Sequence, residues 1–138
     1  MARFSVGIVG YGEPKKNPHV RCFEDFARGI ASALRTLGHE VTSASDPDPG
    51  RLIMFGANNV TDPHGKMPKD AIVYNPEQVA SAAGAFLMQN RDQFRDHVIW
   101  DYSTANAAAL RSMGMRRVVL CPVGFVPSMR MIAPLPPE

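Results

Sequence analysis

The sequence is poor in cysteine, in net charge and in long apolar runs, and each shortage argues against a class of protein. Cys22 and Cys121 are its only cysteines and form no CxxC motif, which favours reduced thiols in a cytoplasmic protein over a disulfide framework. Fifteen basic and thirteen acidic residues leave a formal charge of +2, too little to indicate nucleic-acid binding. No apolar run approaches the roughly 20 residues of a membrane span, and the amino terminus lacks a signal-peptide pattern.

What the chain does contain is an alternation of apolar runs and helical patterns. Its 138 residues suffice for one domain with its own core. Six apolar runs predict strands, at residues 4–12, 40–45, 51–57, 71–75, 98–100 and 116–124. Strands that alternate with helices favour parallel pairing through right-handed crossovers. We therefore predict an α/β domain with a mostly parallel, doubly wound sheet of about six strands flanked by helices.

Local signals mark the ends of the expected helices. Asn17-Pro18 predicts a helix start, because asparagine is a good N-cap and proline fits the first turn, and Gly38 predicts the end of that helix. The same dipeptide at Asn75-Pro76 predicts the start of a second helix. Ser103 is the expected N-cap of a third helix, which should stop at Gly114.

Two motifs that would indicate a cofactor or a metal are incomplete. Gly10-Tyr11-Gly12 resembles the start of a dinucleotide fingerprint, but Lys15 occupies the third glycine position, and Asp46 lies too far along the chain to bind a ribose. Asp62 and His64 lie close together in a long loop but have no third ligand, so a surface loop is the better interpretation. We expect neither a cofactor nor a metal.

Polar residues follow the predicted strands. Asn75 ends the fourth run and Glu77 follows it, Asp101 and Tyr102 follow the fifth, and His19 stands in the first turn of the first helix. In a parallel sheet these positions share the end at which open α/β sheets bind ligands. Four of these five residues also have a structural alternative: the two acids favour a helix dipole, the tyrosine packs, and the histidine is a solvated helix-start residue.

Three segments resemble a known family. Residues 68–78, 98–106 and 122–127 contain YNPEQ, WDYSTAN and PVGFVP, which are similar to a YNxEQ, WDYSxxN and PxGYxP series in certain bacterial and viral GT-B-type glycosyltransferases. The series belongs to their amino-terminal domain. Residues 28–41, with the pattern LxxLGHEV, resemble the first helix and second strand of that domain. Phe125 departs from the pattern, which more often has tyrosine there.

The resemblance implies a Rossmann-like acceptor-side domain over residues 1–127 and a Pro-rich tail or interdomain linker over residues 128–138. Such enzymes place two Rossmann-like domains around a cleft, and the second domain holds most of the nucleotide-sugar. The chain would then act on a glycan or another hydroxyl-bearing acceptor only together with a donor-binding domain or subunit, generally without a metal. A cleft normally covered by another domain would also favour self-association as a homo-oligomer.

The resemblance also implies roles for individual residues. His19 would be the general base that takes the proton of the acceptor hydroxyl. The cleft and its substrate contacts would involve Gly12, Asn75, Glu77, Asp101, Tyr102 and Asn106. The alternative is a non-enzymatic Rossmann-like binding or protein-interaction domain, which would keep its function after His19→Ala and Asp101→Ala if its partner used another surface. A self-sufficient nucleotide-binding enzyme is a third hypothesis, disfavoured by the failed glycine fingerprint.

Overall fold

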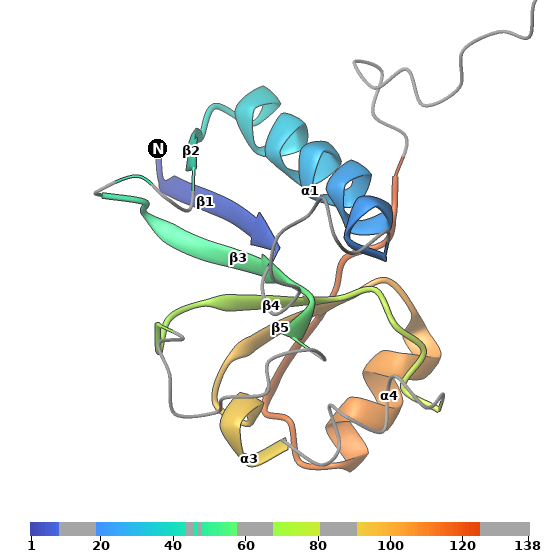
Figure 1. The fold of residues 1–138 in the computed structure, drawn as a ribbon. Coiled ribbons are helices and arrows are strands. Elements are labelled where there is room, and N and C mark those ends of the chain that lie inside the picture. Colours follow the sequence, from blue (N-terminus) through green and yellow to red (C-terminus); the bar gives the residue numbers. More distant parts are fainter. Residues whose placement is uncertain (9–18, 44–45, 47, 58–67, 81–90, 125–138) are drawn as a thin grey trace, which may run out of the picture.

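The computed structural model describes residues 1–8, 19–43, 46, 48–57, 68–80 and 91–124, with the side chains of residues 19–22 excepted (Figure 1). Its elements in chain order are β1 (Arg3–Ile8), α1 (His19–Thr36), β2 (Glu40–Ser43), β3 (Arg51–Phe55), β4 (Ile72–Asn75), α3 (Arg91–Phe94), β5 (Val98–Asp101), α4 (Thr104–Ser112) and β6 (Arg117–Leu120).

All six strands form one parallel sheet in the order β2-β1-β3-β4-β5-β6. The predicted α/β class, the parallel sheet and the number of strands are thereby confirmed. Because β2 and β3 lie on opposite sides of β1, the winding reverses between β1 and β3, as in doubly wound folds. All strands finish at the same end, which we call the carboxyl end of the sheet.

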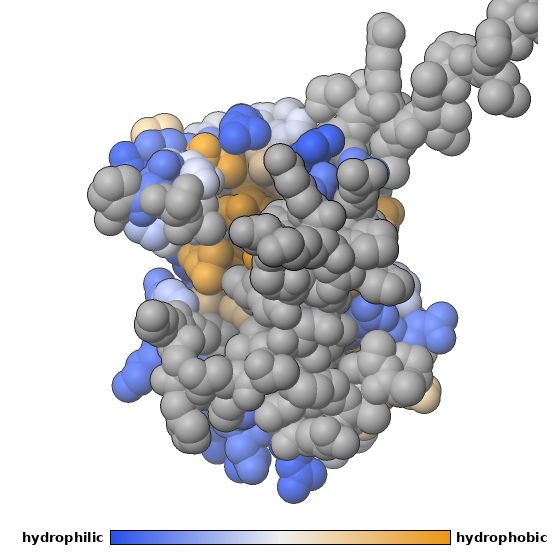
Figure 2. Space-filling view, viewed as in Figure 1, coloured by the Kyte–Doolittle hydropathy of each residue, from blue (hydrophilic) through white to orange (hydrophobic). Residues whose placement is uncertain are grey.

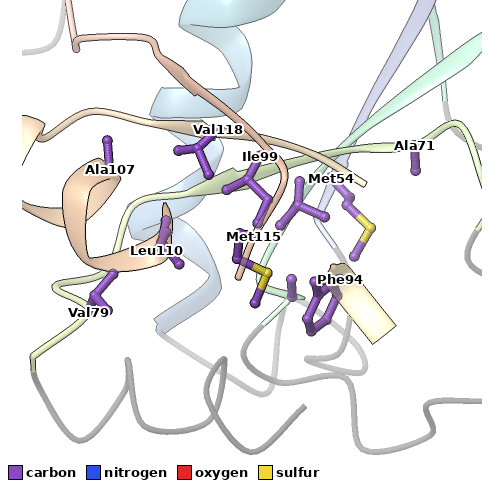
Figure 3. Packing of buried hydrophobic residues seen from close by; sticks show 11 residues of the cluster. Met54, Ala71, Val79, Phe94, Ile99, Ala107, Leu110, Met115 and Val118 are labelled. Carbon is purple, nitrogen blue, oxygen red and sulfur yellow. The ribbon is translucent and has the colours of Figure 1, made fainter. Parts of the chain in front are cut away.

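Helices lie on both faces of the sheet (Figure 1). Helix α1 packs against β1 and β2 on one face, whereas α4 packs against β5 and β6 on the other. Alternating strand side chains supply a core to each face. The α4 face holds the cluster of Figure 3: Met54, Ala57, Ala71, Val73, Val79, Phe94, Ile99, Ala107, Leu110, Met115 and Val118. The α1 face holds Phe23, Leu34, Ile53, Phe55, Ile72, Tyr74 and Val98.

The two long helices end as their glycines predict. Gly38 has φ +82° and Gly114 has φ +90°, a region that residues with a Cβ enter at a cost. At the end of α1, the His39 N–H donates to the Leu34 carbonyl at 3.0 Å, the six-to-one bond of a Schellman motif. Helix α4 ends with the same pattern of bonds and begins at Ser103, whose hydroxyl accepts from the backbone N–H three residues on.

The helix predicted to start at Asn75-Pro76 does not start there, because residues 76–80 form bends and turns. The Asn75 side chain does not cap a helix. It instead bonds both the N–H and the carbonyl of Glu77, which closes a tight local turn. Residues 81–90, which hold most of that predicted helix, lie outside the described residues, as do Asn17-Pro18 and the proposed linker at residues 128–138.

Apolar residues reach the surface in the described part of the chain. On the face shown in Figure 2, apolar surface (orange) lies beside β1, β2 and β3, and hydrophilic residues (blue) lie at several places around the edge. None of the helices in the described part of the chain has both the length and the apolar character that crossing a bilayer requires.

Candidate functional site

Two polar residues meet where β4 and β5 end. Asn75 and Asp101 are direct neighbours in the register of the two strands, and Asn75 Nδ2 donates to Asp101 Oδ2 at 2.7 Å. Asn75 is 2% exposed and Asp101 is fully buried. The second carboxylate oxygen of Asp101 accepts from the Ser103 N–H at 2.8 Å. Hydrogen-bond donors thus replace water around this carboxylate, which is the condition for burying one.

A second asparagine joins α4 to the loop after β4. Asn106 is in the first turn of α4 and is 8% exposed. Its Nδ2 donates to the Glu77 carbonyl at 2.9 Å, and its Oδ1 accepts from the Val79 N–H at 3.1 Å. The Glu77 carbonyl also accepts from Asn75 Nδ2 at 3.0 Å, and the Glu77 N–H donates to Asn75 Oδ1 at 3.3 Å. The two backbone polar groups of Glu77, its N–H and its carbonyl, are therefore both held by asparagine side chains.

Hydrogen bonds also connect the residue that follows β6 to the ends of β4 and β5. The Cys121 N–H donates to the Asp101 carbonyl at 2.7 Å, and the Tyr74 hydroxyl donates to the Cys121 carbonyl at 3.2 Å. The Tyr74 ring stacks on Phe55 with 4.7 Å between centroids. The pKa of Tyr74 is raised to about 12, mainly by burial and to a smaller extent by the nearby Cys121 and Asp101. Burial also raises the pKa of the free Cys121 thiol.

The buried and the accessible polar groups of this site differ in what they can do. Asn75, Asp101 and Asn106 use their side chains in bonds within the protein, so they are suited to hold the loops in place. Glu77 and Tyr102 are only half-buried. Among the described residues neither forms an ion pair. Their carboxylate and hydroxyl are therefore our candidates for contact with a ligand at this end of the sheet.

The structure unites four of the predicted site residues in one hydrogen-bonded network: Asn75, Glu77, Asp101 and Asn106. Tyr102 follows Asp101 in the loop before α4. His19 is the first residue of α1, and its side chain is outside the described part, as is all of Gly12.

Sequence reasoning missed the part that Tyr74 plays. A tyrosine in a fully buried strand indicates a hydrogen bond inside the protein, because its hydroxyl needs a partner there. That partner is a carbonyl 47 residues away, which no local pattern identifies.

The described residues contain no group of three or more His, Cys, Asp or Glu side chains placed to hold a metal ion. Asp62 and His64 lie in residues 58–67, outside that part of the chain. The described surface also has a hollow of about 180 Å³, lined by Arg91, Asp92, Arg95, Met113 and Met115. These residues precede β5 and β6, so the hollow lies toward the amino end of the sheet, away from the network.

Comparison of the chain with protein-family models, with curated proteins and with solved structures finds no match in any of the three. The fold itself is a parallel α/β sheet consistent with the Rossmann-like class. Because such folds host many activities, a function for this chain has to be argued from its site.

Proposed function

We propose that the chain is the acceptor-side domain of a GT-B-type glycosyltransferase. It would contribute to the transfer of a sugar from a nucleotide-sugar to a hydroxyl-bearing acceptor, such as a glycan, only together with a donor-binding domain or subunit. The acceptor would bind at the carboxyl end of the sheet, beside the loops that follow β4 and β5.

The observation that carries this proposal is the convergence of the segments that resemble the family. Asn75 of the YNPEQ segment bonds Asp101 of the WDYSTAN segment, although the two are 26 residues apart. Cys121, directly before the PVGFVP segment, bonds the same aspartate through its backbone. The first two segments, and the residue that precedes the third, therefore lie together at the end of the sheet where open α/β folds bind ligands, which supports a shared role in binding.

The chemistry of glycosyl transfer assigns the remaining roles. The acceptor oxygen attacks the anomeric carbon, the bond from that carbon to the diphosphate breaks, and the acceptor proton passes to a base. His19 is our candidate for the base, because an imidazole titrates near neutral pH. A crossover helix between parallel strands starts at their carboxyl end, so the first residue of α1 belongs to this end of the sheet. Glu77 and Tyr102 would bind acceptor hydroxyls.

The proposal can be tested by NMR titration of the isotope-labelled chain with simple glycans, nucleotides and nucleotide-sugars. We expect glycans to shift the amide signals of Glu77, Tyr102 and Asn106, and nucleotide-sugars to bind only weakly. Tyr102→Phe and His19→Ala should weaken glycan binding, whereas Asp92→Asn, an exposed change toward the amino end of the sheet, should not. Saturable nucleotide-sugar binding without glycan binding would contradict the proposal, as would silence across the panel.

A non-enzymatic interaction domain is the second candidate, and the outer strand β6 favours it. Val119 and Leu120 are 47% and 42% exposed on this strand, and Val123 just after it is 56% exposed. An apolar edge strand pairs readily with another chain. If this is the function, Val119→Lys should abolish association with a partner or with a second copy in sedimentation experiments, while His19→Ala should leave that association intact.

A further inference from the structure

Three buried side chains determine where one loop residue, Glu77, lies. Its carbonyl accepts from Asn75 at 3.0 Å and from Asn106 at 2.9 Å, and its N–H donates to Asn75 at 3.3 Å. Asn75 is itself held by Asp101 at 2.7 Å. Loop residues usually have mobile, solvated backbones, so a backbone fixed from two elements at once indicates that the position of this residue matters.

The side chain of Glu77 has no comparable support. It is half-buried, and among the described residues no lysine, arginine or histidine pairs with it. Partial burial removes water from a carboxylate at a cost in free energy, which a hydrogen-bond donor or a cation has to offset. A fixed backbone that presents a half-buried side chain, with no cation beside it in the described part of the chain, leaves the carboxylate oxygens for the donors of a ligand.

We infer that Glu77 selects the acceptor, and that it selects an uncharged polyhydroxylated molecule over an anionic one. This inference rests on the proposed function and names the substrate class of the same site. An ionised carboxylate only accepts hydrogen bonds, so two hydroxyls of one sugar ring can donate to its two oxygens. A uronate or phosphate in that place would bring a second negative charge to about 4 Å, where like charges repel even in water. Asn75, Asn106 and Asp101 act as positioning residues.

The test uses pairs of sugars that differ only at C6, which is a hydroxymethyl group in one and a carboxylate in the other. The full chain is titrated with the methyl glycosides of glucose, galactose and mannose and with the corresponding methyl uronosides, and dissociation constants are taken from NMR shifts. For the ring that binds, we expect the neutral glycoside to bind at least about fivefold more tightly than its uronoside. Added salt should reduce that preference, because it screens the repulsion.

Three variants separate an effect on selection from an effect on folding. Glu77→Gln keeps the size of the side chain and all three backbone bonds but removes the charge, so the preference should fall to within about twofold. Asp96→Asn, an equally sized change at an exposed acid, should leave the preference unchanged. Asn106→Ala should lower the preference and should also speed hydrogen exchange at Val79, the amide that Asn106 accepts from.

The outcomes distinguish this inference from the proposed function. If neutral sugars bind and the preference is the same in Glu77→Gln as in the unmodified chain, the selection role is wrong and the acceptor-side function stands. If uronosides bind as tightly as neutral sugars in the unmodified chain, the substrate class is wrong. If no glycoside of either kind binds, the acceptor-side function itself fails, and the inference fails with it.

Discussion

The amide of Asn75 donates to the carboxylate of Asp101 across two neighbouring strands, at a position where both residues are buried. Side chains at matching positions of adjacent strands point to the same face, so strand register alone brings this amide and this carboxylate together. The bond connects the end of β4 to the end of β5. The loop that carries Glu77 and the start of α4 are both attached to this pair by hydrogen bonds.

Removal of the Asp101 carboxylate should destabilise the fold. Asp101→Ala leaves the Asn75 amide and the Ser103 N–H without their acceptors in a buried place, so we expect the free energy of unfolding to fall by about 3 kcal/mol in urea titrations. Asp96→Ala removes an exposed acid and should have almost no effect. Equal stabilities of the two variants would contradict a supporting role for the network.

Two glycines with positive φ should differ in their tolerance of alanine. Gly38→Ala puts a Cβ into open space, so it should cost only the backbone strain of about 1 kcal/mol. At Gly50, with φ +70°, the added Cβ would lie 2.7 Å from the Arg3 carbonyl oxygen, and a backbone atom cannot move aside easily. Thermal unfolding should therefore show a larger loss for Gly50→Ala, and a smaller loss there would show that β1 shifts freely.

Stability should fall at alkaline pH partly because of Tyr74. Its pKa is raised to about 12, above the ordinary value of 10.0, chiefly by burial. The folded state therefore keeps the proton that the unfolded state has released, and this contribution, complete below about pH 10, is lost as the pH rises toward about 12.

The matched variant for this prediction is Tyr74→Phe, which lacks both the proton and the bond to the Cys121 carbonyl. At neutral pH it should be less stable than the unmodified chain by about 1 kcal/mol in urea unfolding. The difference between the two should shrink between about pH 10 and 12, since only the unmodified chain can lose the phenolic proton. A constant difference across this range would show that Tyr74 does not titrate as its surroundings imply.

Cys121 should react slowly with alkylating agents. Burial raises the pKa of its thiol, and the thiolate is the reactive form. In a Cys22→Ser variant, which has only this thiol, iodoacetamide should react more slowly at mildly alkaline pH than with a short cysteine peptide. Unfolding in urea should restore the peptide rate. An equal rate in the folded state would mean that the thiol is solvated.

Several parts of the fold follow from short stretches of sequence. The apolar runs place all six strands to within a few residues, and Ser103, Gly38 and Gly114 mark helix ends correctly. Capping and left-handed turns depend on neighbours within about five positions, which a local pattern contains. The same reasoning misplaced the helix start at Asn75-Pro76, because the Asn75 side chain bonds both backbone groups of Glu77 and the distant Asp101, and so closes a turn instead of opening a helix.

What the sequence determined by itself is therefore the class of fold and the end of the sheet where polar residues gather. Only the tertiary structure decided the strand order β2-β1-β3 and the partners of each polar side chain. The Asn106 amide finds the Glu77 carbonyl 29 residues away, and Tyr74 finds the Cys121 carbonyl 47 residues away. Such bonds depend on the register of parallel strands and on how a helix packs across them, and both result from burying the two apolar faces of the sheet together.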